Sequence, residues 1–552
     1  MRAIARLRTV VSLTIAAAVV VGGVSLGAQP SQAATLTLPD SGTIGGVDVS
    51  RAVDWTTVPS GTQFAYIEAT VNGAMNSSFY ANWSGATRAG LARGAYSFGQ
   101  PNASAANGAT QAKFFYAHGG ALSTANDFTL PPALDLELDS TGQCWSLSLG
   151  QLRDWVTNFI TTFKSLSGVT PVIYTSSGFW NNCIQTSTLG KYPLWVADPD
   201  PGTLGNPNFG GATTWAFRQF SLDSQNGTPF DYDEYHGTLA QLQAMSTPRI
   251  SGVDRFATGL AASLSFAPGV DTAYVASGTN FPDALAAGAA AGKKGGPVLL
   301  TLPNAVPADL KTALGFLRPA HIVVVGGTAA VSNAVLTALK SYSPSVTRLQ
   351  GADRTATSAA IATSTFSAYV PNAYVAMGND WPDALSGSAL AASAKGSGPM
   401  LLVTTTSVPT AVKNALTALK PAHITVLGGT AVVSNSVVTA LRSYTTTKAA
   451  ASVSRIAGAD RFATSAAIAK QLASVAGKSG TVYAASGVTF PDALVGAPVA
   501  ALDSSPVLLV TPTSLPASVK AEVTALAPSA VAILGGKASV SASVQAALNS
   551  AK

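Results

Sequence analysis

Residues 131–140 read PPALDLELDS, and this stretch places three carboxylates on an otherwise apolar segment. Asp135, Glu137 and Asp139 alternate with leucines, and alternate side chains of a β-strand share one face. Carboxylates that lie close together raise one another's pKa, because each negative charge disfavours a second one nearby. Alone, the stretch is typical of a half-exposed strand with a solvated polar face. A strand that presents acids to an active site is the alternative.

Short apolar segments recur on both sides of this stretch, and helical patterns such as SLGQLRDWVTNFITTFKSL lie between several of them. Roughly 200 residues of alternating strand and helix predict a (β/α) barrel over residues 43–240. Active groups of such barrels gather at the C-terminal strand ends, where Asp48, Glu68 and Asp231 also lie. The segments are GGVDVSRAVDW at 45, FAYIEAT at 64, AGLARGAYSF at 89, TPVIYTSSGFW at 170, YPLWVAD at 192, TWAFRQFS at 214 and PFDYDEY at 229.

The motifs GVDVS, GAYSF, LDLE, PVIYT, LWVA and FDYD together resemble the glycoside hydrolase family 25 muramidases, a type of lysozyme. The resemblance implies that Glu137 is the general acid and that Asp135 raises its pKa and stabilises developing positive charge. It implies that Asp48 and Asp231 are the other active-site acids. The implied reaction cleaves the β-1,4 bond after N-acetylmuramic acid with retention, and needs neither metal nor cofactor. The nucleophile is either the substrate's acetamide or an enzyme carboxylate.

Aromatic residues near the strand ends are candidates for stacking on sugar faces. Tyr96 and Trp195 lie within motifs of the family and are the better candidates, followed by Tyr66 and Tyr174. The alternative for each of them is a place in the barrel core.

The sequence departs from the family pattern at several positions near the predicted site. Ser97 stands where the family often has His, Asp233 where Asn is usual, and Glu68 where Lys is frequent. Glu68 would add charge to an already acidic site. No departure removes a predicted catalytic acid, so we expect activity.

Internal repetition organises the C-terminal half. RISGVDRFAT at 249, RLQGADRTAT at 348 and RIAGADRFAT at 455 are versions of one phrase, and each is followed by a PDAL motif, an apolar strand and a GG turn. Asp383 follows Asp283 by 100 positions, and Asp492 follows Asp383 by 109. Short β-rich runs alternate with helical patterns in each copy, which predicts three α/β units with parallel sheets. Their expected bounds are 249–345, 346–445 and 453–552.

DRFAT, FPDAL and GGxxxVS in combination resemble the cell wall binding repeat type 2 family. The resemblance implies non-covalent anchoring to an anionic polymer of a Gram-positive wall, with the three units arranged as a pseudo-trimer. Candidate polymer contacts are Arg255, Arg354 and Arg461, and structural ion pairs are the alternative. We interpret the three aspartates of the PDAL motifs as helix caps rather than ligands.

Charge is unevenly divided along the chain, which has 11% charged residues and a net charge of +6. Residues 35–248 carry 8 basic and 15 acidic side chains, whereas residues 249–552 carry 21 basic and 11 acidic ones. The basic half should prefer an anionic polymer. An exported protein meets wall polymers before nucleic acid, so we predict no nucleic-acid partner.

Residues 1–33 read as a secretion signal, with Arg2, Arg6 and Arg8 before an apolar run and a small-x-Ala site at Ser31-Gln32-Ala33. The run is long enough that an uncleaved anchor is the alternative. No later segment resembles a membrane span. We therefore predict a secreted protein associated with the bacterial wall, with no membrane contact after signal removal.

The chain has two cysteines, Cys144 and Cys183, and an even pair in an exported protein predicts a disulfide. Two free buried thiols are the alternative. A zinc site is disfavoured, because no second Cys or His lies at ligand spacing.

The leading hypothesis is a secreted, monomeric lysozyme that cuts peptidoglycan and is held at the wall by its basic repeats. One alternative is a non-catalytic wall or surface-layer protein whose barrel only binds glycan. Another is a hydrolase of chitin-like polymers. Four retained acids argue against a pure binder.

Overall fold

The computed structural model describes residues 36, 38, 42–71, 73–120, 129–140, 143–167, 169–198, 207–239, 241–242, 249–279 and 282–552. The predicted signal, residues 1–33, lies outside these residues. Contacts divide the chain into two compact units near residue 247, a catalytic unit and a repeat unit, and each is described by itself. Within the described part, no helix has both the length and the apolar character to cross a membrane.

The catalytic unit contains an eight-stranded barrel, as predicted. Strand β1 pairs with both β2 and β9 and so closes the sheet. Neighbours run parallel except at β9, which is antiparallel to β8 and β1. The barrel strands are β1 (Ile44–Val49), β2 (Phe64–Val71), β4 (Ala92–Phe98), β5 (Ala133–Leu136), β6 (Val172–Thr175), β7 (Leu194–Ala197), β8 (Phe217–Ser221) and β9 (Asp231–Tyr235); β3 (Ala74–Met75) forms a hairpin with β2.

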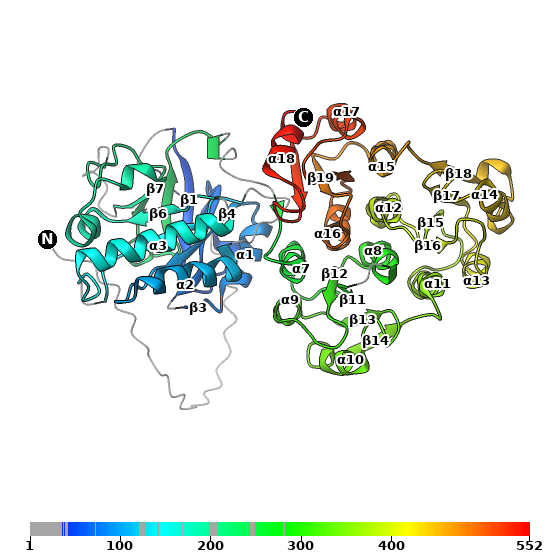
Figure 1. The fold of residues 1–552 in the computed structure, drawn as a ribbon, viewed down its shortest axis with the longest axis horizontal. Helices are drawn as coiled ribbons and strands as arrows, with labels where there is room; N and C mark the ends of the chain where they lie inside the picture. The colour runs from blue at the N-terminus through cyan, green and yellow to red at the C-terminus, as the bar shows by residue number, and fades with distance from the viewer. Residues whose placement is uncertain are drawn as a thin grey trace, which may run out of the picture. The chain divides into compact units, whose positions relative to one another are not determined.

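Helices cover the first half of the barrel more fully than the second. The long helices follow β3, β4 and β5, and α2 and α3 pack side by side (Figure 1). Short turns replace them later, and a short connection makes β9 antiparallel. The helices are α1 (Phe79–Arg88), α2 (Ala105–Phe115), α3 (Leu149–Ser167), α4 (Ser177–Phe179) and α5 (Asp223–Asn226), with η1 (Trp55–Thr57), η2 (Tyr116–Gly120), η3 (Trp180–Ile184) and η4 (Leu189–Lys191).

Aromatic rings fill the barrel, and two glycines make room for them. A Cβ on Gly46 would lie 2.2 Å from the ring of Phe64, and one on Gly94 would lie 2.1 Å from the ring of Tyr66. Side chains larger than hydrogen are therefore excluded at both positions. The rings form a packed core rather than a pore.

The predicted disulfide is present and joins Cys144, in the loop after β5, to Cys183 in η3, at a sequence separation of 39. Cys183 is buried. The chain-entropy model gives about 4 kcal/mol for closing a loop of this length. The bond ties the segment after β5 to η3, which follows β6.

The repeat unit contains three four-stranded parallel sheets, in the orders β12-β11-β13-β14, β16-β15-β17-β18 and β20-β19-β21-β10. The strands are β10 (Arg249–Ile250), β11 (Thr272–Ser277), β12 (Val298–Thr301), β13 (His321–Val325), β14 (Ser345–Leu349), β15 (Asn372–Met377), β16 (Met400–Val403), β17 (His423–Leu427), β18 (Val453–Ile456), β19 (Thr481–Ser486), β20 (Val507–Val510) and β21 (Ala530–Leu534). The predicted parallel-sheet units are confirmed.

Each sheet takes its last strand from the next repeat in sequence. β14 opens the second repeat but pairs with β13 of the first, and β18 opens the third but pairs with β17 of the second. β10, where the first repeat begins, pairs with β21 of the third. The three repeats therefore form a closed ring rather than an open array.

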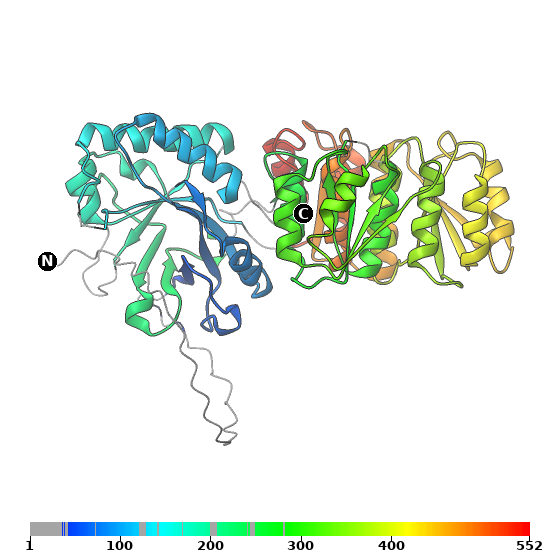
Figure 2. The ribbon, with the colours of Figure 1, turned by 90° about the horizontal axis from the view of Figure 1, so that it is seen from below.

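Three helices with PDAL motifs, α8, α12 and α16, contact one another at the centre of the ring (Figure 1). Small residues allow the close approach: a Cβ on Gly292 would lie 2.3 Å from that of Ala392. The outer helices cover the sheets, and in Figure 2 the green strands of the first repeat lie between green helices. The helices are α7 (Arg255–Ser263), α8 (Pro282–Lys294), α9 (Ala308–Leu317), α10 (Asn333–Leu339), α11 (Arg354–Thr365), α12 (Pro382–Ala392), α13 (Thr410–Leu419), α14 (Asn435–Leu441), α15 (Arg461–Ala476), α16 (Pro491–Leu502), α17 (Ala517–Leu526) and α18 (Ala542–Asn549).

Candidate active site and wall-binding residues

The topology brings the four predicted catalytic acids to one mouth of the barrel. Asp48 lies near the C-terminal end of β1, and Asp231 begins the antiparallel strand β9 directly opposite it. Asp135 lies near the C-terminal end of β5, and Glu137 follows that strand. C-terminal ends of parallel strands meet at one edge, and the N-terminal end of an antiparallel strand meets them there.

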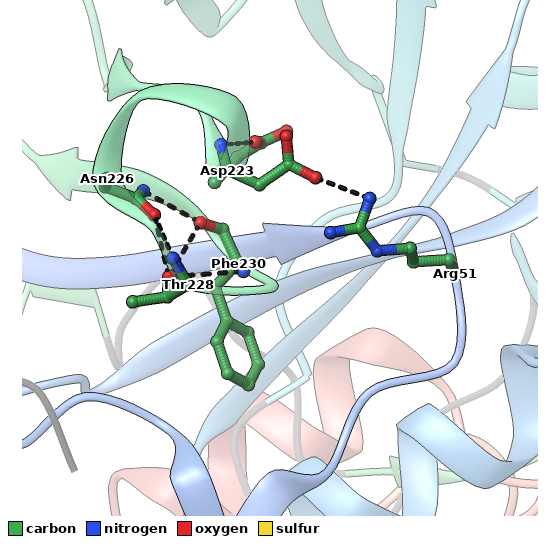
Figure 3. A network of polar contacts seen from close by, with 6 residues as sticks. Arg51, Asp223, Asn226, Thr228 and Phe230 are labelled. Atoms are coloured by element: carbon green, nitrogen blue, oxygen red, sulfur yellow. Dashed lines mark hydrogen bonds and ion pairs between the residues drawn. The ribbon is translucent and has the colours of Figure 1, made fainter. Parts of the chain in front are cut away.

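Asp231 is fixed by the turn that precedes β9. One of its carboxylate oxygens accepts a hydrogen bond of 2.6 Å from the amide of Asp223, and Asp223 forms an ion pair of 2.7 Å with Arg51 (Figure 3). In the same turn the Asn226 side chain bonds Thr228 and the carbonyl of Phe230. The turn therefore holds the acid from two sides.

Asp135 and Glu137 differ in exposure although they are two residues apart. Asp135 is 4% exposed, whereas Glu137 is partly exposed beyond the end of the strand. The Trp145 indole donates a hydrogen bond of 2.8 Å to the backbone carbonyl of Glu137. This bond fixes the backbone that carries the predicted proton donor.

Asp233 forms the centre of a buried polar cluster beneath these acids. It is fully buried on β9, accepts a hydrogen bond of 2.9 Å from the Trp195 indole, and lies within hydrogen-bond reach of the Asp48 carboxylate. Burial and then the charge of Asp48 raise the pKa of Asp233 well above its ordinary value. Two carboxyl groups form a hydrogen bond only when one holds a proton, and we assign that proton to Asp233.

A second chain of hydrogen bonds reaches Asp48 through Gln219, which pairs with Asp233 across β8 and β9. The Tyr174 hydroxyl donates to the Gln219 side-chain oxygen at 2.8 Å, and the amide nitrogen of Gln219 donates to Asp48. Asp48 thus accepts from a neutral amide and from a protonated carboxyl. Both contacts hold its carboxylate in one orientation.

The four predicted sugar-stacking residues lie inside the barrel. Tyr66, Tyr96 and Tyr174 surround Trp195, with ring centroids 4.6 Å, 6.1 Å and 4.7 Å from it. Their exposed fractions are 0–4%, which favours the barrel-core alternative. As placed, they support the buried acids from below, and direct stacking on sugar stays a prediction.

Sequence reasoning missed the partly exposed Trp145. Its ring lies 6.3 Å from that of Phe98 and lines a cleft of about 290 Å³ together with Gln100, Asn107 and Gln111. The sequence could have indicated Trp145, because it lies eight positions after Glu137 and directly after Cys144 of the predicted disulfide. Glu68 is buried and accepts a hydrogen bond of 2.8 Å from Asn76.

The DRFAT arginines of the repeats join neighbouring repeats. The Arg354 and Arg461 side chains each donate to a glycine carbonyl of their own repeat at 2.9 Å. The Arg461 guanidinium also lies 5.6 Å from the Trp381 ring of the preceding repeat, and Arg255 lies 5.8 Å from the Phe490 ring of the third. The side chains are only partly buried. Polymer contact by these arginines stays a prediction beside this structural role.

The helix-cap interpretation of the PDAL aspartates is wrong for Asp383 and Asp492. The N-caps of α12 and α16 are the preceding aromatic residues, without side-chain cap bonds. Aspartates that cap helices are instead those of the DRFAT motifs, such as Asp353 and Asp460, which accept from amides of α11 and α15. The pattern misled because Asp beside Pro at a helix start resembles a cap.

The PDAL aspartates instead face the GG turns and the next repeat. A Cβ on Gly428 would lie 2.3 Å from an Asp383 carboxylate oxygen, and φ there is 99°, so only glycine fits. Burial raises the pKa of Asp383 to about 6, Asp380 adds to the shift, and Arg461 of the next repeat opposes it. Asp283 and Asp492 stand in the same relation to the arginines of their neighbours.

Among the described residues, no group of three His, Cys, Asp or Glu side chains is placed to hold a metal ion.

The barrel resembles known glycoside hydrolases in sequence. The model for glycosyl hydrolases family 25 matches residues 47–227. Lysozyme M1 of Streptomyces globisporus is 36% identical over 232 residues, which cover 40% of this chain and 77% of that protein. The N,O-diacetylmuramidase of Chalaropsis is 35% identical over 155 residues, or 26% of this chain and 72% of that protein. The chain belongs to glycosyl hydrolase family 25.

The family 25 unit is followed by three matches to the cell wall binding domain 2 model, at residues 249–336, 348–438 and 455–545. Cwp8 from Clostridium difficile shares 23% identity with a TM-score of 0.50, covering 57% of this chain and 53% of that one. That likeness shows the fold alone. This family 25 hydrolase therefore carries three cell wall binding repeats.

Proposed function

We propose that this family 25 protein is a secreted lysozyme that hydrolyses the β-1,4 bond between N-acetylmuramic acid and N-acetylglucosamine in peptidoglycan. One observation carries the proposal: four acids lie at one mouth of the barrel. They are Asp48 on β1, Asp135 on β5, Glu137 directly after β5, and Asp231 at the start of β9. The names of the relatives, lysozyme and muramidase, support the same substrate.

Glycoside hydrolysis needs one protonated carboxyl at the leaving oxygen and one ionised carboxyl near the positive sugar centre. Glu137 is the more exposed of the β5 pair and takes the proton-donating role, because it reaches beyond the strand end. Asp135 takes the stabilising role, either towards the substrate's acetamide or towards the sugar centre. Asp48 and Asp231 complete the acidic surface around the sugar.

The basic repeats are proposed to hold the enzyme non-covalently at an anionic polymer of the wall. Tethering raises the local concentration of enzyme at an insoluble substrate. Support comes from the domain 2 matches and from the excess of basic residues in 249–552. The protein acts as a monomer in this proposal, since the ring of three repeats is closed within one chain.

The deciding experiment digests purified peptidoglycan with wild type, Glu137→Gln and the control Asp154→Asn, an exposed acid on α3. We expect Glu137→Gln to release muropeptides about 10²–10⁴-fold more slowly, the range for loss of a general acid. The control should match wild type. New reducing ends should be N-acetylmuramic acid. Equal release by Glu137→Gln, or reducing ends of glucosamine, would contradict the proposal.

The anchoring role is tested by retention of the full chain on purified walls at increasing salt. Raising salt from about 0.1 M to about 1 M shortens the Debye length from about 10 Å to about 3 Å, so retention should fall. Retention that ignores ionic strength would count against attraction by charge.

A further inference from the structure

The second repeat differs from the other two at one turn. After α11, Tyr369 takes the left-handed conformation, with φ of 65°, and 70% of its side chain is exposed. Its amide donates to the carbonyl of Leu419. The same turn of the first repeat has Gly269, with φ of 83° and its amide bonded to the carbonyl of Leu317. The third repeat leaves its helix differently: Gly477, with φ of 89°, is the C-cap of α15, and its amide bonds the carbonyl of Ala473.

The turn does not require a tyrosine, and a tyrosine in this backbone conformation lowers the stability of the fold relative to glycine. A left-handed conformation is unfavourable for an L-residue with a Cβ, and glycine avoids this cost. Tyr369 recovers part of it through Lys420, whose ammonium lies 4.9 Å from the centre of the ring and 3.3 Å from the hydroxyl. A contact of this kind is weak when it is exposed to water. Strain held at an exposed aromatic residue points to a use outside the fold.

Two clefts meet at Tyr369, one of about 700 Å³ and one of about 390 Å³. Neither has an acidic residue among its described lining residues. Exposed basic side chains line both: Lys293, Lys395 and His423 in the larger, and Lys420 and Lys448 in the smaller. We call Tyr369 with these two clefts the Tyr369 surface.

The connection that carries Lys395 of the larger cleft is longer in the second repeat than in the first. Met400 follows Asp383 by 17 positions, whereas Val298 follows Asp283 by 15. The extra residues lie between α12 and β16, where Lys395 is. The first repeat has a shorter connection at this place.

A second insertion supplies a basic residue of the smaller cleft. Arg455 follows Leu441 by 14 positions, whereas Arg348 follows Leu339 by 9. The extra residues carry Lys448. The tyrosine and both insertions therefore belong to one repeat and meet at one place.

The chemistry of the Tyr369 surface fits a chain of sugar rings with acidic groups. An exposed ring offers an apolar face on which a sugar can stack, as aromatic residues do at wet interfaces. Lysines on both sides attract anionic groups, and Asn372 and Thr425 of the larger cleft offer neutral polar partners. A flexible chain that crosses the tyrosine can enter both clefts.

We propose that the Tyr369 surface binds an anionic glycan of the cell wall, with a sugar ring on Tyr369 and acidic groups on the flanking lysines. This proposal rests on the proposed anchoring function and assigns part of it to the second repeat. The surface is separate from the DRFAT arginines. Tyr369 precedes β15, whereas Gly378, the partner of Arg354, follows it, so the two lie at opposite ends of that strand.

The test uses Tyr369→Gly in the full chain, which copies the glycine of the first repeat. The matched control is Ala527→Gly, which relieves an exposed left-handed residue of the third repeat, with φ of 49°. We expect Tyr369→Gly to weaken retention on purified Gram-positive walls about 3- to 10-fold, the range for loss of one aromatic contact. Its melting temperature should stay equal or rise, and Ala527→Gly should bind like wild type.

Each result separates the possibilities. Unchanged retention of Tyr369→Gly overturns the proposal, and so does a lower melting temperature, because the side chain would then serve the fold. Failure of wild type itself to bind walls overturns the anchoring function instead. A Tyr369→Gly defect that disappears on walls stripped of phosphodiester polymers identifies a phosphate-bearing glycan, and one that persists identifies a carboxylated glycan. A defect abolished by protease treatment of the walls means a protein partner and overturns the proposal.

Discussion

Two groups of buried acids have opposite surroundings: the aspartates at and beneath the barrel mouth, and the PDAL aspartates of the repeats. In the barrel, the charges of Asp48 and Asp231 both raise the pKa of Asp233, so acid faces acid. In the repeats, each PDAL aspartate faces an arginine that lowers its pKa against the effect of burial: Arg354 for Asp283, Arg461 for Asp383 and Arg255 for Asp492. Acids that repel one another cost stability, whereas acids paired with cations join elements. The unfavourable surroundings of the barrel acids fit the proposed function, in which such acids act on the sugar, whereas the paired repeat acids join neighbouring repeats.

The largest expected effect comes from Asp48→Asn, which tests the barrel side of this comparison. Removing a charge that opposes Asp233 should raise the thermal stability of the catalytic unit at neutral pH. The same change should lower muropeptide release about a thousandfold, since the acidic surface around the sugar loses a member. Calorimetry and digestion of peptidoglycan measure the two effects. A variant that loses both stability and activity would mean that Asp48 is structural.

The next effect concerns Arg249, which is 6% exposed and closes the ring of repeats. It donates to the carbonyls of Gly535 and Val540 and to the Gln545 side chain. Arg249→Met should lower the free energy of unfolding of the repeat unit by about 3–5 kcal/mol, because its partners lose their donors in a buried place. Arg348, its counterpart between the first two repeats, is only partly buried.

Arg348→Met is therefore the matched control, and it should cost less than half as much in the same urea titration of the full chain. Equal losses would show that the closing junction is no different from the internal ones.

A smaller effect follows from Asp383, whose pKa burial raises to about 6 from the ordinary 3.8. The folded state then binds more protons than the unfolded state between these values, so stability falls as pH rises through about 4 to 6. Asparagine does not titrate. Asp383→Asn should therefore gain roughly 2–3 kcal/mol relative to wild type from pH 4 to pH 7.

Asp353 of the same repeat should give stability the opposite dependence on pH, because hydrogen bonds from the Thr355 side chain and the Ala356 amide lower its pKa. Its contribution to stability is present at neutral pH and is lost as pH falls below the ordinary value. Melting curves of Asp353→Asn and Asp383→Asn across pH should diverge in opposite directions. Parallel curves would contradict the assignment of both groups.

The smallest effect is expected for Asp233→Asn. Asparagine keeps a donor towards Asp48 and an acceptor for Trp195, so activity at acidic pH should change by less than about threefold. Wild type should lose stability as pH rises, because the raised pKa of Asp233 means that the folded state holds a proton that the unfolded state releases, and the variant should lack this loss. Melting curves from acidic to alkaline pH measure this. A pH dependence of stability that the variant reproduces would assign the dependence to another group.

Much of this architecture could be predicted from sequence, because local patterns decide it. The apolar segments around LDLEL each predict one strand, and the repeated DRFAT and PDAL motifs each predict the start of one helix. The order of these strands and helices predicts the barrel and the parallel sheets. What failed needed contacts between distant residues. Nothing local shows that β10 pairs with β21, or that Asp383 faces Arg461 rather than capping its own helix.

The candidate site shows the same limit. Parallel topology alone places Asp48 and Asp135 at one mouth. The expectation that Asp231 lies at a C-terminal strand end was wrong, because Asp231 begins β9 and reaches the same mouth only since that strand is antiparallel. The burial of Tyr66 and Trp195 depends on how the whole barrel packs and on glycines such as Gly94, where a Cβ would meet the Tyr66 ring. The proton on Asp233 depends on its distance from Asp48, which no spacing along the chain expresses.

The exchange of edge strands has a mechanical consequence. The segment that leaves the catalytic unit enters the ring through β10, and β10 is hydrogen-bonded to the last repeat rather than to the first. A force applied to the barrel therefore acts first on the junction between β10 and the third repeat. The hydrogen bonds from Arg249 to the carbonyls of Gly535 and Val540 oppose the separation of this junction. Because the ring is closed, we expect such a force to load all three repeats together, rather than to unfold them one after another.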